Sequence, residues 1–133
     1  MVDTVNFELV QGADWVINIG LQNDDSTPVD LTGCQVHMQV RPYPSASAVV
    51  IDLSTANSGI TITNAAQGQI AWHMTAAQTA LLTPALSSPP GFQPSTLQRF
   101  LGYFDLFVEF TDGEILPYLN GQMFLDISIT HPF

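Results

Sequence analysis

The chain has 133 residues, enough for one domain with a hydrophobic core that needs neither disulfide nor metal. Hydrophobic residues make up 46% of the chain, which excludes an intrinsically disordered protein. It contains 2 basic and 12 acidic residues, and the resulting net charge of −10 opposes binding to the phosphates of nucleic acids.

The sequence also bears on location. The N-terminal region lacks the basic segment and apolar run of a secretory signal peptide. No segment approaches the length of about 18 apolar residues that a membrane span requires. We therefore expect a protein that is made in the cytoplasm, makes no contact with a membrane and stays soluble until it joins a larger assembly.

Two alternating segments open the chain, at residues 5–9 and 15–21. Side chains of a strand point to opposite faces with a period of two, so both segments predict half-buried strands. Gly12 separates them and predicts a bulge or a bend between two sheets rather than a full hairpin.

A polar turn follows at residues 22–26. This turn contains Asp24 and Asp25, and together with Asp30 they suggest a calcium site. Their spacing lacks the glycine and the distal glutamate of a calcium loop, so we favour a solvated turn without metal. Calcium is the one ion that a binding test should include.

The clearest strand begins after Gly33, behind a predicted turn at residues 28–33. Apolar and polar residues then alternate strictly: Cys34, Val36, Met38 and Val40 against Gln35, His37, Gln39 and Arg41. This pattern predicts a core strand with one buried and one solvated face. Cys34 is the single cysteine, which excludes an intramolecular disulfide and favours a buried thiol over a nucleophile.

The middle of the chain predicts three further strands, at residues 48–53, 60–63 and 69–74. Ile70, Trp72 and Met74 share one face of the last segment. Trp15 and Trp72 are each in phase with aliphatic neighbours, which favours core positions over exposed platforms for sugars.

A short helix is predicted at residues 75–82. Thr75 is a suitable N-cap, and Gln78 stands at the capping-box position. We expect Leu81 and Leu82 to close one end of the sheets.

Residues 83–98 contain four prolines and no strand pattern, and an unstructured connection of this length is usually functional or disordered. We call this segment the insertion. Residues 99–110 predict a central strand because both of its faces are apolar. Asp112 and Gly113 predict a hairpin turn. In residues 115–130, Asn120 and Gly121 fit either a tight hairpin or a bulge in one long strand.

These segments predict an all-β fold, an immunoglobulin-like two-sheet β-sandwich of about eight strands with one short helix. Residues 1–133 form a single domain that carries the insertion. The paired cysteines of antibody domains are missing, so the prediction concerns architecture alone. We expect five side chains to be almost completely buried: Val36, Met38, Trp72, Phe104 and Leu106.

Motifs for catalysis are missing from the sequence: it has no G-x-S-x-G elbow, no phosphate-binding glycine loop and no H-E-x-x-H. We expect no catalytic residue and no cofactor. His37, His73 and His131 occupy separate segments, which favours surface histidines over a metal site. Asp105 and Glu109 share a strand face, and spacing alone leaves open a pair of carboxylates for glycoside hydrolysis.

A series of short motifs covers nearly the whole chain in order: residues 11–13, 28–33, 36–41, 52–55, 59–62, 68–70, 75–82, 103–106, 112–113 and 119–121. Together they resemble the small immunoglobulin-like proteins encoded among the structural genes of tailed phages. The family is similar to the N-terminal domain of upper baseplate proteins, which attaches receptor-binding parts to the virion. The resemblance implies one strand over residues 119–130, with Gly121 in a bulge, and it implies no catalytic residues. The chain departs from the family in the insertion, where such proteins have a brief link.

The resemblance implies a non-enzymatic virion protein, an adaptor or fibre-attachment component of the tail or baseplate. Its expected partners are other virion proteins, in multiple copies and a symmetric assembly. A capsid decoration (cement) protein is one alternative. The other is a carbohydrate-binding module, which requires an exposed aromatic row such as Tyr43, Phe92 and Tyr118.

The insertion supplies the candidate partner-binding residues, which are Pro89, Pro90, Phe92 and Leu97. Prolines restrict the backbone, so ordering this segment against a partner costs less entropy than ordering a flexible linker. Phe92 would then anchor the contact. The competing interpretation is a lid that covers Leu82 and Leu86 at an open end of the sandwich.

Overall fold

The structure is a computed structural model, and it describes residues 2–85, 89–92, 97–127 and 129. Within these residues the larger sheet has six strands: β1 (Asp3–Thr4), β2 (Phe7–Val10), β4 (Gln35–Arg41), β5 (Ile51–Ser54), β8 (Gln98–Glu109) and β9 (Ile115–Asp126). The smaller sheet has three: β3 (Trp15–Gly20), β6 (Ile60–Asn64) and β7 (Gln69–Met74). A 3₁₀ turn, η1 (Ala65–Gln67), precedes β7, and a single α-helix, α1 (Ala76–Ala80), follows it.

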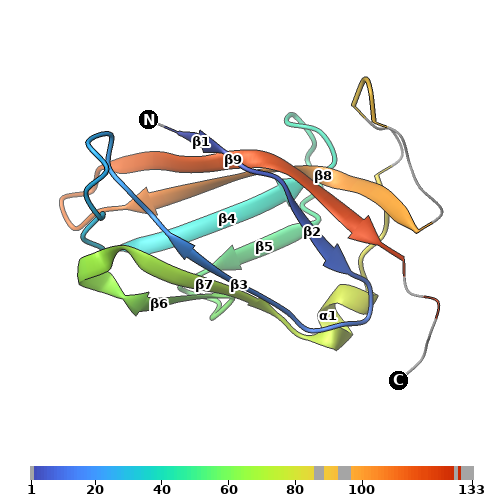
Figure 1. Cartoon of the computed structure of the whole chain (residues 1–133), viewed down its shortest axis with the longest axis horizontal. Coiled ribbons are helices and arrows are strands. Elements are labelled where there is room, and N and C mark those ends of the chain that lie inside the picture. Colours follow the sequence, from blue (N-terminus) through green and yellow to red (C-terminus); the bar gives the residue numbers. More distant parts are fainter. Residues whose placement is uncertain (1, 86–88, 93–96, 128, 130–133) are drawn as a thin grey trace.

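The two sheets lie face to face (Figure 1). The larger sheet has the order β1-β9-β8-β4-β5, with β2 also paired to β9, and the smaller has the order β3-β7-β6. This division of strands between two layers is that of an immunoglobulin-like sandwich. The predicted fold class is therefore confirmed, and β8 is the central strand that its two apolar faces predicted.

The chain changes sheets at Gly12, between β2 and β3. Gly12 has a φ of +82°, which favours glycine, and its N–H donates to Thr79 Oγ1 at 3.1 Å. The Thr79 hydroxyl, completely buried in α1, in turn donates to the carbonyl of Ala13 at 2.8 Å. Of the two predicted alternatives at Gly12, a bulge or a bend between two sheets, the structure shows the bend.

Helix α1 begins with the predicted capping box. Gln78 N donates to Thr75 Oγ1, and Thr75 N donates to Gln78 Oε1 at 2.8 Å. Leu82 is buried as expected, but the prediction for Leu81 is wrong, because that side chain is 82% exposed. Adjacent residues near a helix end point in different directions, so both leucines cannot face the sheets.

No helix in the described part of the chain has the length and apolarity needed to cross a membrane.

Strand β9 runs unbroken from Ile115 to Asp126, so the prediction of one strand through Asn120 and Gly121, rather than a hairpin, is confirmed, although the strand ends before the predicted residue 130. The predicted bulge at Gly121 is wrong, because Gly121 pairs in register with Phe104 of β8. The β8–β9 pairing instead shifts register at two other places, where one strand has a residue without a partner on the other strand. These residues are Tyr118 of β9 and Leu101 of β8.

Gly121 has a different role, set by the N-terminal strands. The strand predicted at residues 5–9 is observed as β2, which begins two residues later, and the two-residue strand β1 precedes it; both are parallel to β9. Between them Val5 N donates to Asn120 O at 2.9 Å, and a Cβ on Gly121 would collide with the carbonyl oxygen of Val5. Glycine is required here because the backbone of residue 5 lies directly against it.

Trp72 occupies the centre of the core. Its ring packs against Phe7 at 5.1 Å, Phe104 at 5.7 Å and Trp15 at 5.9 Å between ring centroids. These residues come from both sheets, so the aromatic cluster joins the layers. All five side chains predicted for the core are confirmed there: Val36, Met38, Trp72, Phe104 and Leu106.

Trp72→Ala should lower the free energy of unfolding by about 3–5 kcal/mol, because it leaves a large cavity between the sheets. Urea denaturation monitored by circular dichroism measures the loss. Trp72→Phe keeps an aromatic ring and should cost much less. An alanine variant that melts within a degree or two of the parent protein would contradict the role of Trp72 in joining the sheets.

Gly121→Ala should also destabilise the protein, because the added methyl group displaces the backbone near Val5. Gly20→Ala is the matched control, since a Cβ at that strand position meets no atom within 4 Å. Thermal melts compare the two variants. Equal melting temperatures would show that the N-terminal strands do not depend on contact with Gly121.

Candidate interaction surface

The larger sheet packs one face on the smaller sheet, and we call its opposite side the outer face. Side chains alternate along each strand, so the pairing of β5, β4, β8 and β9 places every second side chain on the outer face, and most of these are polar or aromatic. The polar and aromatic ones are Gln35, His37, Gln39, Arg41, Asp52, Tyr103, Asp105, Phe107, Glu109, Asn120, Gln122 and Phe124. The polar half of β4 is thus on the solvated side, as the sequence predicted.

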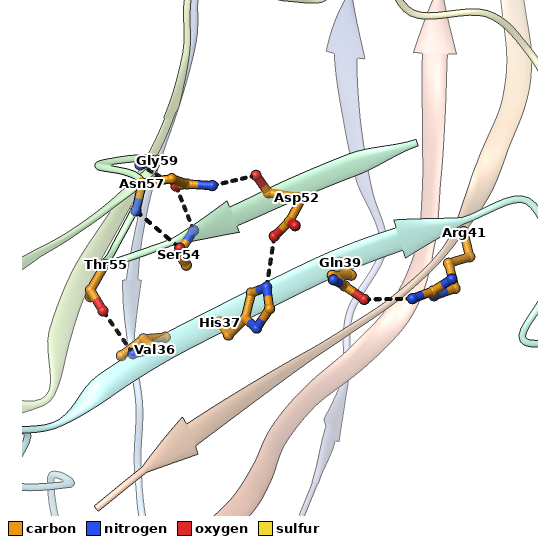
Figure 2. Close-up of polar contacts among 9 residues, drawn as sticks. All are labelled: Val36, His37, Gln39, Arg41, Asp52, Ser54, Thr55, Asn57 and Gly59. Carbon is orange, nitrogen blue, oxygen red and sulfur yellow. Dashed lines mark hydrogen bonds and ion pairs between the residues drawn. The ribbon is translucent and has the colours of Figure 1, made fainter. Parts of the chain in front are cut away.

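A hydrogen-bonded pair joins β4 to the edge strand β5 (Figure 2). His37 Nε2 lies 2.6 Å from Asp52 Oδ1, and both side chains are about half exposed. Asn57 supports the end of β5, because its Nδ2 donates to Asp52 O at 2.8 Å and its Oδ1 accepts from Ser54 N. Water screens such a pair, so it orders the surface more than it stabilises the fold.

Arg41 is held at the other end of β4. Its Nη2 donates to Gln39 Oε1 at 2.9 Å, and its Nη1 donates to the carbonyl of Ala46 at 2.7 Å. The guanidinium therefore fixes the loop after β4 and orients the Gln39 amide beside it (Figure 2). Its positive charge is one of two in the whole sequence.

Asp105 lies in the middle of the outer face, in register with Gln39 on one side and Asn120 on the other. Partial burial raises the pKa of Asp105 above its ordinary value of 3.8, and the charges of Arg41 and His37 oppose this shift. Glu109, the second acid of the same strand face, is exposed at the far end of β8. The face offers hydrogen-bond acceptors and amide donors to a partner.

Two shallow hollows cover this face. One, of about 730 Å³, lies over β1, β9, β8 and β4 and is lined by Gln39, Arg41, Asn120 and Gln122 among others. The second, of about 680 Å³, is lined by His37, Glu109 and Ile115 among others. Asp105, Phe107 and Gln39 line both, so the hollows adjoin along β8.

Apolar side chains lie exposed on the outer face beside the turn between β8 and β9, and we call Phe107, Ile115 and Pro117 the apolar strip. Ile115 is 57% exposed and Phe107 is 36% exposed, whereas the partly exposed Leu116 pairs with the buried Val108 and so lies on the other face. Phe107 pairs with Pro117 across the two strands. Sequence reasoning missed this strip, although the apolar character of both faces of β8 was a signal for it.

The described parts of the insertion lie at the other end of β8 and β9. The Phe92 ring stacks on Phe124 at 5.5 Å, with 11° between the planes, and it also contacts Phe100. Pro90 and Leu97 are exposed, and Pro89 is half-buried. The structure therefore brings Phe92 to the outer face of its own sheet. Leu86, which the lid interpretation requires, lies outside the described residues.

The acidic turn is organised by local hydrogen bonds. Asp25 Oδ1 accepts from the Thr27 hydroxyl at 2.6 Å and from its N–H, and these bonds lower the pKa of Asp25. Asp30 accepts the same two bonds from Thr32, with the same effect on its pKa. Among the described residues, no group of three or more histidine, cysteine, aspartate or glutamate side chains is arranged to hold a metal.

The histidines are not brought together: His37 lies on β4 of the larger sheet and His73 on β7 of the smaller, while His131 is outside the described residues. Cys34 is buried as predicted, and burial raises the pKa of its thiol.

The aromatic row that a carbohydrate-binding module requires is not formed by Tyr43, Phe92 and Tyr118. Tyr43 is exposed, but Tyr118 is buried and packs against Phe110. Tyr118 is the extra residue at the β9 register shift, where the regular alternation of inward and outward side chains is interrupted.

No protein-family model and no curated protein sequence matches the chain. Among solved structures, the chain is similar to Tim-1, with 10% identity, a TM-score of 0.43 and coverage of 99% of this chain and 100% of that one. It is also similar to a chain from work on multimeric cell-adhesive interactions of VGSC beta subunits, with 8% identity, a TM-score of 0.41 and coverage of 96% and 93%.

Asp105→Asn should raise the melting temperature at neutral pH, because the amide avoids the cost of a partly buried charge. The pKa of Asp105 is raised in the folded protein, so the native state gains stability as pH falls through that pKa. The benefit of the substitution should thus be full above the raised pKa and vanish below pH 3.8. Glu109→Gln, which removes a charge from an exposed position of the same face, is the control for the loss of one negative charge.

Proposed function

We propose that the chain is a non-enzymatic structural protein of a tailed-phage virion. In this proposal it is an adaptor or fibre-attachment component of the tail or baseplate. It is made in the host cytoplasm and joins other virion proteins in a symmetric assembly of multiple copies. The observation that carries the proposal is the outer face, which combines an exposed apolar strip with adjoining polar hollows.

The composition of the outer face is that of a protein contact. Exposed aromatic and aliphatic side chains beside hydrogen-bonding groups are typical of interface cores and rims. The apolar strip, with Phe107 and Ile115 exposed, supplies the apolar part. Gln39, Asp105 and Asn120 supply donors and acceptors in the adjoining hollow.

The family resemblance supplies the setting. Its motifs coincide with structural features that a shared fold would retain: the turn at Gly33, the capping box of α1, the hairpin turn at Gly113 and the close approach at Gly121. These features support a common architecture with baseplate attachment domains. They do not name the partner.

The insertion is the second contact in the proposal, through Pro89, Pro90, Phe92 and Leu97. The Phe92 ring is already ordered by stacking on Phe124, which lowers the entropy cost of binding a neighbour. Leu97 is 38% exposed just before the start of β8. A partner that covers the outer face would meet Phe92.

The test is incorporation into particles. Phage particles that assemble with an epitope-tagged copy of the chain are purified and imaged by cryo-EM with a label on the tag. We expect the label at the tail or baseplate. A label on the capsid surface would favour the decoration alternative, and unlabelled particles would refute a virion role.

Phe107→Ser combined with Ile115→Ser should reduce the copies per particle about tenfold or more, because loss of central apolar contacts weakens an interface strongly. The melting temperature should stay near that of the parent, since both side chains are exposed. Leu81→Ser is the matched control, an exposed leucine on α1 away from the outer face. Normal incorporation of the double variant would contradict the role of the apolar strip.

A further inference from the structure

Strand β3 is an edge of the smaller sheet, and among the described residues it pairs only with β7. The pairing is regular over all of Trp15–Gly20, with no register shift. Along its other side, an edge strand presents unpaired backbone N–H and C=O groups. These groups are a template for an added strand.

The hydrogen-bond pattern shows which groups of β3 face outward. Leu21 N donates to Gly68 O at 2.8 Å, which continues the β3–β7 register by one pair. Bonded pairs alternate in an antiparallel ladder, so the backbones of Trp15, Ile17 and Ile19 bond to β7. The backbones of the alternate residues point away from β7: Val16, Asn18 and Gly20.

This edge lacks the features by which proteins protect exposed strands, which are charges, prolines, bulges and short length. Residues 15–20 include no charged residue and no proline. The other edges are protected: β5 and β2 have four residues each and carry Asp52 and Glu8, and the β6 pairing shifts register near Asn64. The contrast singles out β3 as the one unprotected edge of the described sheets.

We propose that β3 pairs antiparallel with β3 of a second copy of this chain, around a two-fold axis at Asn18. In this register Asn18 faces Asn18 of the second copy, and Val16 faces Gly20. Each of these pairs exchanges two N–H···O bonds, so every outward backbone group of the strand is used. The two smaller sheets become one continuous sheet.

The shape of the strand favours a second copy as the occupant. Residues 15–20 carry no charge, so they add nothing to the repulsion between two chains that each carry a net charge of −10. Val16 is 56% exposed, and the Gly20 opposite it leaves open space for its side chain. The inference stands independently of the virion assignment, because it uses neither the outer face nor the insertion.

Sedimentation and amide exchange test the pairing directly. At millimolar concentration we expect a dimer in which the amides of Val16, Asn18 and Gly20 exchange slowly, and on dilution these amides should exchange fast. The amides of Ile17 and Ile19 bond to β7 and should be protected at both concentrations. A protein that remains a monomer at millimolar concentration refutes the second copy as occupant, as does a dimer in which the outward amides stay unprotected.

Two variants locate the interface. Val16→Lys places a charge on the β3 edge and should abolish the dimer. Thr61→Lys is the control: it places a charge at an exposed position of β6, the other edge of the same sheet, and should leave the dimer intact. Asn18→Cys should form an intermolecular disulfide on mild oxidation, because facing Cα atoms of a bonded pair lie about 5.5 Å apart. Thr61→Cys should form none. Equal effects of the two lysine variants, or equal crosslinking of the two cysteine variants, would overturn the proposal.

Discussion

The contact between Trp72 and Phe104 is the interaction on which the sandwich depends, because it joins β7 of the smaller sheet to β8 of the larger. The indole N–H of Trp72 is buried without an acceptor among the described residues, which costs about 1–3 kcal/mol. Burial of an indole ring contributes about 4–6 kcal/mol, from 150–250 Å² of surface at 25 cal/mol per Å². The apolar term is larger, so an unpaired donor is tolerated at the centre of the core.

Features of the fold that depend on neighbours in sequence were predictable. The alternation after Gly33 identified β4 and its buried face, and Thr75 with Gln78 identified the start of α1. Features that depend on distant segments were not. The register shift at Tyr118 arises from the pairing of β9 with β8, and the contact between Val5 and Gly121 arises from pairing between segments far apart in the sequence; neither leaves a local periodic signal.

The candidate site was predictable to a smaller extent for the same reason. The sequence identified Phe92 as an apolar residue that requires a contact, but it did not identify Phe124 as the ring on which Phe92 stacks. It placed His37 on the solvated face of its strand, yet the bond to Asp52 depends on the pairing of β4 with β5. A surface is assembled from several strands, so knowledge of each strand alone does not define it.

The parallel pairing of β1 and β2 with β9 also fixes the order in which the protein is completed during synthesis. In the described structure, the strands within residues 3–10 pair with no strand other than β9, so they have no sheet partner until residues 119–126 leave the ribosome. Phe7, whose ring contacts both Trp72 and Phe104, enters the core at that step. Contacts between segments so far apart close slowly, because a long loop loses entropy before they form. The strands within residues 3–10 therefore stay unpaired while residues 11–118 are translated, a stage at which chaperones would recognise the exposed Phe7 and Leu9.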